Sequence, residues 1–161
     1  MSLLIDNAPK SVNIDGAEVE INSDFRTAIL FEQMMFDEDF PEHLKIANAL
    51  QLFYSVLPTN LNEAVDKLIW FYSCGKDREE SSSKQSENSR CYDFEYDDGY
   101  IYAAFMQQYG IDLESVEYLH WWKFNALFKS LTNDCEIVKI MGYRTTVSYT
   151  HLRAHETAAN L

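Results

Sequence analysis

The stretch from Tyr96 to Leu131, YDDGYIYAAFMQQYGIDLESVEYLHWWKFNALFKSL, decides the fold of this chain. It predicts two helices joined at Gly110, because glycine supplies the left-handed residue at which helices commonly end. Asp112 stands where the N-cap of the second helix is expected. The inward positions of that helix recur at three- and four-residue spacings, which mark one helical face: Trp121, Phe124, Phe128 and Leu131. We therefore expect a Tyr118–Leu131 helix at the centre of the core.

A β-hairpin and three helices are predicted before this stretch. The hairpin covers Val12 to Ile21, where Asp15-Gly16 is a turn dipeptide between alternating apolar residues. The first helix is expected from about Phe25 to Phe36, behind the N-cap candidates Asn22 to Asp24. The other two are expected between Pro41 and Pro58 and from Asn60 to Gly75. Their apolar spacings place these side chains inward: Ile46, Leu50, Phe53, Leu57, Leu61, Val65, Leu68 and Tyr72.

The fold class that follows is mainly α, with five or six helices and a short N-terminal β-hairpin. The segment from Lys76 to Cys91 is rich in serine and charge and has no large apolar residue, so it predicts a flexible, disordered insert. Neither flanking half carries enough apolar surface to stand alone with certainty, and we expect one domain over residues 1–146. A last helix is predicted at residues 135–141.

Composition narrows the classes of partner. The formal net charge is −13, from 26 acidic and 13 basic residues, which argues against nucleic acid because phosphate binding needs clustered lysine and arginine. No segment has the length and apolarity of a membrane span, and the N-terminus lacks the basic start of a signal peptide. Three cysteines without CxxC spacing fit reduced thiols in a cytosol.

The C-terminal residues 147–161 form a separate case. The string VSYTHLRAHET at residues 147–157 resembles the translation of a transposon-derived sequencing adaptor, so we expect residues 147–161 to be a non-native tail. His151 and His155 lie one helical turn apart and imitate half a zinc site. We expect no metal there and no specific packing.

No catalytic, cofactor or metal site is predicted elsewhere. The acidic run from Asp93 to Gly99 fails as an EF-hand loop, because its sixth and twelfth positions hold Asp98 and Ala104. It is more typical of a solvated turn at a helix N-terminus. The sequence has no GxSxG, P-loop or GxGxxG pattern. His120, beside two tryptophans, is interpreted as structural, and we expect no enzyme.

Trp121 and Trp122 lie about 100° apart around a helix, so they cannot point in one direction. The interpretation that a thickly covered helix buries both is favoured. The alternative is that one indole stays exposed as an interaction anchor. Tyr118, Trp121 and Trp122 are accordingly the candidate partner-binding residues.

Three segments carry a family resemblance: SVNIDGAEVEINSDFRTAILFEQ, IYAAFMQQYGIDL and LHWWKFNALFKSL. Over about residues 3–144 the chain resembles the bacteriophage gene-product-fifteen family of phages and prophages of Gram-positive bacteria. That family has no established catalytic residues to carry over. Its genes usually lie between those of major tail components and the tape-measure protein, the position of tail assembly chaperones.

The resemblance implies a non-enzymatic tail morphogenesis protein of the host cytoplasm. It would act as a tail assembly chaperone whose partner is the tape-measure protein and which coats the apolar helices of that protein. Two alternatives stay open: a structural component of the tail, retained in the virion, and a small enzyme. Mass spectrometry of purified phage separates the first alternative from a chaperone, and the second would need a pocket of converging titratable groups.

Overall fold

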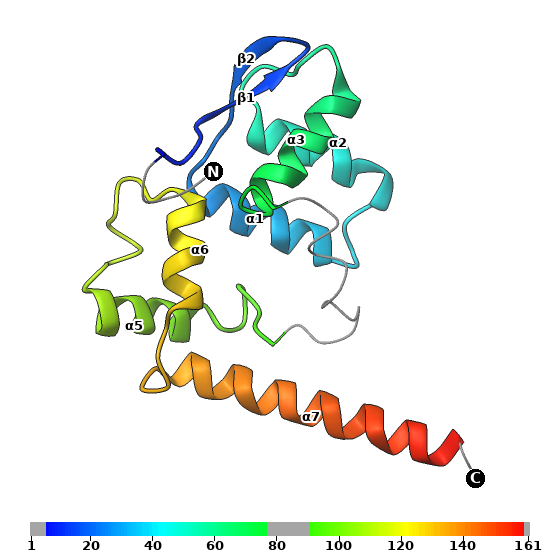
Figure 1. Cartoon of the computed structure of the whole chain (residues 1–161), viewed down its shortest axis with the longest axis vertical. Coiled ribbons are helices and arrows are strands. Elements are labelled where there is room, and N and C mark those ends of the chain that lie inside the picture. The colour runs from blue at the N-terminus through cyan, green and yellow to red at the C-terminus, as the bar shows by residue number, and fades with distance from the viewer. Residues whose placement is uncertain (1–5, 77–90, 160–161) are drawn as a thin grey trace. The chain divides into compact units, whose positions relative to one another are not determined.

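The computed structural model describes residues 6–76 and 91–159, and side chains as far as residue 147. Within these residues six helices follow an N-terminal β-hairpin (Figure 1), which confirms the mainly α fold class. The elements are β1 (Ser11–Ile14), β2 (Ala17–Glu20), α1 (Phe25–Phe36), α2 (Glu42–Phe53), α3 (Leu61–Tyr72), α5 (Asp98–Tyr109), α6 (Trp121–Lys129) and α7 (Glu136–Ala159). The predicted Ser-rich insert lies almost entirely outside the described residues.

The elements group into two compact units. The N-terminal unit holds the hairpin, α1, α2, α3 and residues 117–126; the C-terminal unit holds α5, α7 and the end of α6. A single domain over residues 1–146 stays a prediction. No helix in the described part of the chain combines the length and apolarity needed to cross a membrane.

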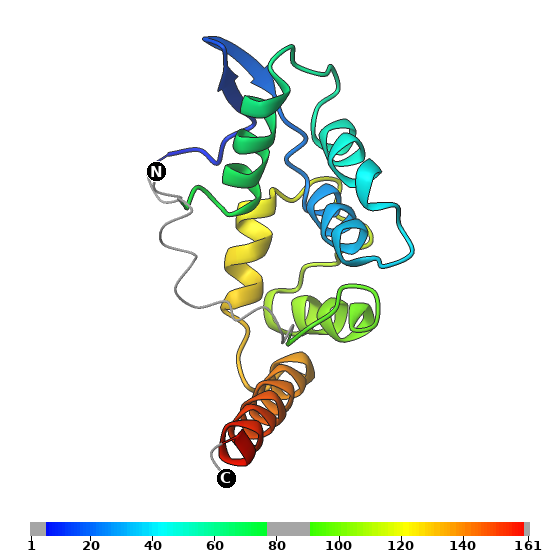
Figure 2. The ribbon, with the colours of Figure 1, turned by 90° about the vertical axis from the view of Figure 1, so that its right-hand side faces the viewer.

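The hairpin forms where the turn dipeptide predicts it. Asp15 and Gly16 have φ of 50° and 78°, the positive values that two-residue hairpin turns require. Val12 pairs with Val19, and Val12 and Ile14 are buried. The hairpin lies beside α3 in both ribbon views (Figures 1 and 2), and the Asp15 amide donates to the Glu63 carboxylate at 2.9 Å. The turn is thereby fixed to the start of α3.

The starts of α1 and α3 also follow their local signals. Asp24 caps α1 by accepting from the Arg26 amide at 3.0 Å, and Asn60 caps α3 by accepting from the Glu63 amide at 3.2 Å. The reciprocal half of the capping box is missing. The Glu63 carboxylate instead accepts a hydrogen bond from the Asp15 amide in the hairpin turn.

Three side chains predicted to face inward from the second and third helices are exposed instead. Ile46, Leu57 and Leu61 are 61%, 50% and 49% exposed, whereas Lys45 is buried. The Lys45 ammonium donates to the carbonyl of Met35 at 3.0 Å, which offsets the cost of burying it. Leu30 on α1 is 52% exposed. Periodicity identifies a helical stripe, but the neighbouring elements decide how far along the helix it is covered.

The central helix is shorter than predicted. It begins at Trp121, because Asp112 caps only a single turn, accepting from the amides of Glu114 and Ser115 at 3.0 and 3.3 Å. Gly110, at φ 65°, ends α5 as expected. The positions predicted to face inward from this helix are all buried: Trp121, Phe124, Phe128 and Leu131. Ala126 on the same helix is exposed.

The acidic run before α5 is not simply a solvated turn. Asp97 is buried, and its carboxylate receives two hydrogen bonds from Arg144 of α7, at 2.5 and 3.0 Å. Asp93 accepts from the amides of Glu95 and Tyr96 and so closes the turn. One acid of the run is therefore a structural ion-pair partner within the C-terminal unit, and another shapes the turn.

The helix predicted at residues 135–141 is the start of α7, which continues to Ala159 and through residues 147–157. Ile137 is fully buried, as expected for its inward side. The side chains of His151 and His155 lie outside the described side chains. The absence of specific packing by the tail therefore stays a prediction.

Gly75 is expected to be the least replaceable glycine of the N-terminal unit. Its φ is +75°, and an added Cβ would lie 2.9 Å from the ring of the buried Trp122. Gly16 is a matched control, since its φ is +78° and nothing lies within 4 Å. Gly16→Ala should cost about 1–2 kcal/mol for the left-handed backbone. Gly75→Ala should cost about 1–3 kcal/mol more for overpacking, measured by urea unfolding. Equal losses would contradict the close approach to Trp122.

Candidate functional site

The candidate site lies in the N-terminal unit, where residues 118–120 run extended into α6. Two backbone hydrogen bonds hold this segment to the entry of α1: the Phe25 amide donates to Leu119 at 2.9 Å, and the Trp121 amide donates to Ser23 at 2.8 Å. The hydroxyls of Ser23 and Tyr118 are 2.7 Å apart. This pairing explains why the helix starts only at Trp121: the preceding backbone groups are bonded to another segment.

His120 connects this segment to the N-terminal arm of residues 7–10. Its Nε2 lies 2.8 Å from the Pro9 carbonyl, and its Nδ1 accepts from the Trp122 amide at 3.0 Å. A carbonyl needs a donor and an amide needs an acceptor, so the ring is neutral with its proton on Nε2. Burial lowers the pKa of His120, and the charges of Lys123 and Lys10 lower it further. Both nitrogens serve the structure, as the sequence interpretation of His120 proposed.

This histidine should make the fold sensitive to acid. Above its ordinary pKa of 6.5 the imidazole is neutral in both folded and unfolded chains, and its structural contribution is complete. As pH falls below 6.5, the unfolded chain takes up a proton that the folded chain resists, so stability is lost until the folded pKa is reached. We expect the thermal midpoint to fall across this window, and expect His120→Gln, though less stable, to remove this part of the fall. His43→Gln, at an exposed position, is the control that should retain it.

A pocket of about 530 Å³ opens beside His120. Its described lining comes from the N-terminal arm and from the start of α6: Asn7, Ala8, Pro9, Lys10, Tyr118, His120 and Lys123. None of these seven residues is acidic, although the chain carries 26 acidic residues against 13 basic ones. The pocket is therefore a cationic site on an acidic protein.

The three residues predicted to bind a partner have different surroundings. Trp121 and Trp122 are each only 3% exposed, and their indole N–H groups donate to Tyr72 and Phe71 carbonyls of α3 at 2.8 and 2.7 Å. The favoured interpretation, that the helix buries both, agrees with this burial. Tyr118 is 43% exposed and lines the pocket. Of the three, it is the one whose ring a partner can reach.

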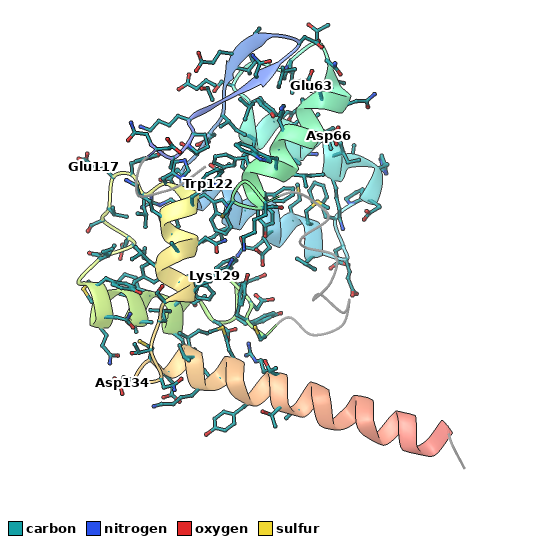
Figure 3. All side chains as sticks on the ribbon, in the orientation of Figure 1. Glu63, Asp66, Glu117, Trp122, Lys129 and Asp134 are labelled. Atoms are coloured by element: carbon teal, nitrogen blue, oxygen red, sulfur yellow. The ribbon has the colours of Figure 1, made fainter. Side chains whose placement is uncertain are left out.

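Figure 3 shows Trp122 at the start of α6, close to α3, and Glu117 in the loop before it. The sequence interpretation did not identify Lys10 or Lys123 as site residues. No spacing rule could have found them, because they lie at distant positions in the chain and line one pocket only in the folded protein. Among the described residues, no three His, Cys, Asp or Glu side chains gather as potential metal ligands.

These observations define a small, mainly helical protein with a hairpin-capped N-terminal unit and a cationic pocket. The chain belongs to the family described as Bacteriophage Gp15 protein, which matches residues 4–158. It is thus a phage protein of the structural or morphogenesis class, and its interactions are with phage proteins. The match extends past Arg144, where the resemblance described from the sequence ends, and into residues 147–157. The origin of that segment stays a prediction. No curated protein and no solved structure matches the chain.

Proposed function

We propose that this protein is a non-enzymatic tail assembly chaperone that acts in the host cytoplasm on the tape-measure protein. Membership of the phage family carries the proposal. A tape-measure protein presents long apolar helices before the tail tube encloses them. A chaperone would cover those helices and leave when the tube polymerises.

Exposed apolar side chains of the N-terminal unit support a helix-binding role. They occur on α1, on α2, in the segment that leads to α3 and at the first residue of α3: Leu30, Met35, Leu44, Ile46, Val56, Leu57 and Leu61. Val56 is 79% exposed and Ile46 61%. Apolar helices dock through anchors at three- and four-residue spacing, and an exposed apolar surface suits them.

The charge of the chain supports the same role. A net charge of −13 keeps a protein with exposed apolar groups soluble and favours neutral or basic partner segments. The link between α1 and α2 and the first residue of α2 carry four exposed acids: Asp37, Glu38, Asp39 and Glu42. A tape-measure segment of neutral or basic charge therefore fits this side of the unit better than an acidic one.

Co-expression with a fragment of the tape-measure protein from the same phage tests the proposal. The fragment should remain soluble with the native chain and precipitate with an Ile46→Asp, Val56→Asp double variant. Tyr143→Asp is the matched control, because Tyr143 is 71% exposed but lies on α7. In infected cells, loss of the gene should leave filled heads without tails. Normal tails without the gene would refute the proposal, and abundant protein in purified virions would favour a structural tail component.

A further inference from the structure

The proposed function does not use the cationic pocket beside His120. Two lysines line it, Lys10 on the N-terminal arm and Lys123 on α6. Within the described residues neither lysine forms an ion pair. Asp24, at the entry of α1, is engaged by Arg26 at 3.3 Å and by the Leu119 amide at 3.2 Å. Because no ion pair among the described residues occupies Lys10 or Lys123, both remain available to a ligand.

The start of α6 adds to this positive potential. The first turn of α6 contains Lys123 and no acidic residue, although helix N-termini favour negative charge. The amides of Trp121 and Trp122 are already bonded, to Ser23 and to His120. These two amides are therefore not available to an anion, and the two lysines are its charged partners.

The Lys10 side chain is held by an aromatic ring and keeps its hydrogen-bond donors. Its ammonium lies 4.7 Å from the centre of the Tyr118 ring. Such a cation–π contact contributes only about 0.5–1 kcal/mol at an exposed site and leaves the three N–H donors available. The Tyr118 ring, with Ala8 and Pro9, gives the pocket an apolar wall beside its charge.

We propose that this pocket binds a carboxylate carried on an apolar or aromatic body. The volume of about 530 Å³ far exceeds the about 30 Å³ of a water molecule, so a bare inorganic ion would not fill it. The net charge of −13 repels a dianion more strongly than a monoanion, which favours carboxylate over phosphate.

The test uses the full chain labelled with ¹⁵N and two matched pairs of probes. One pair is 3-phenylpropionate and 3-phenylpropionamide; the other is the peptide acetyl-Ala-Phe with a free or an amidated C-terminus. Both acids should shift the amide signals of residues 7–10 and 118–123, and neither amide should. Binding of the peptide acid alone would assign the carboxylate to a chain terminus, and binding of phenylpropionate alone to a small organic acid; both support the site.

Variants give the decisive comparison. Lys10→Met and Lys123→Met should each raise the Kd of the acids about tenfold, which is the loss of affinity expected for one charge-assisted hydrogen bond. Lys129→Met is the control, because Lys129 is exposed on the same helix but does not line the pocket. Its Kd should be unchanged, and all three variants should keep the native thermal midpoint. Equal binding of acid and amide, insensitivity to the pocket lysines, or stronger binding of inorganic phosphate would overturn the proposal.

Discussion

Replacing Phe124 by alanine is expected to lower the free energy of unfolding by about 3–5 kcal/mol. Phe124 is fully buried and stacks on Phe25 with ring centres 4.9 Å apart and on Trp121 at 5.7 Å. Truncation leaves a cavity between α1 and α6 and removes both stacking contacts, each worth about 0.5–1.5 kcal/mol beyond area. The measurement is equilibrium urea unfolding followed by circular dichroism.

Phe36→Ala is the matched control. It removes the same ring from the end of α1, where Phe36 is 57% exposed, so the loss should be below about 1 kcal/mol. Similar losses for the two variants would show that the face of α6 carrying Phe124 is not the core of the N-terminal unit. A Phe124→Leu variant should recover part of the loss, because it refills some of the cavity.

Arg144→Ala is expected to destabilise the C-terminal unit by about 3 kcal/mol. The Asp97 carboxylate is only 3% exposed, and removing Arg144 leaves that charge buried with a hydrogen bond from the Asp93 amide at 2.8 Å. Breaking a buried pair costs about 3–5 kcal/mol, and the lower end applies because Arg144 is 42% exposed. Thermal unfolding of Arg144→Ala and Asp97→Asn compares the stability lost when either partner of the ion pair is removed.

Asp97→Asn should cost less, about 1 kcal/mol, because Arg144 can turn its charge to water. The two variants should also differ in acid. The Arg144 hydrogen bond lowers the pKa of Asp97 below its ordinary 3.8. The stabilisation is therefore complete above pH 3.8 and is lost as pH falls from 3.8 toward the folded pKa. The advantage of the native chain over Asp97→Asn should shrink in that window; a constant advantage would mean that the charge is unimportant.

A chain ending at Thr146 is the control for this region, because it keeps Arg144 and removes residues 147–161. If those residues make no specific packing contacts, its thermal midpoint should equal that of the full chain. A lower midpoint would contradict the interpretation of residues 147–161 as a non-native tail. It would also give a structural meaning to the family match beyond Thr146.

The sequence by itself determined the local architecture. Asp15-Gly16 specifies a hairpin turn because both residues take positive φ, and Gly110 ends α5 for the same reason. Asp24 and Asn60 start α1 and α3 because a side-chain oxygen reaches an amide two or three residues ahead. These interactions act within a few residues, so the order of side chains along the chain is enough to predict them.

Only the tertiary structure decided which surfaces are covered and which charges meet. Lys45 is buried and Ile46 exposed because the Met35 carbonyl lies within reach of one and no neighbour covers the other. Asp97 and Arg144 meet from α5 and α7, and Lys10 and Lys123 meet at a pocket whose arm is held by His120. Helical period does not encode such meetings, because they depend on how separate elements pack in three dimensions.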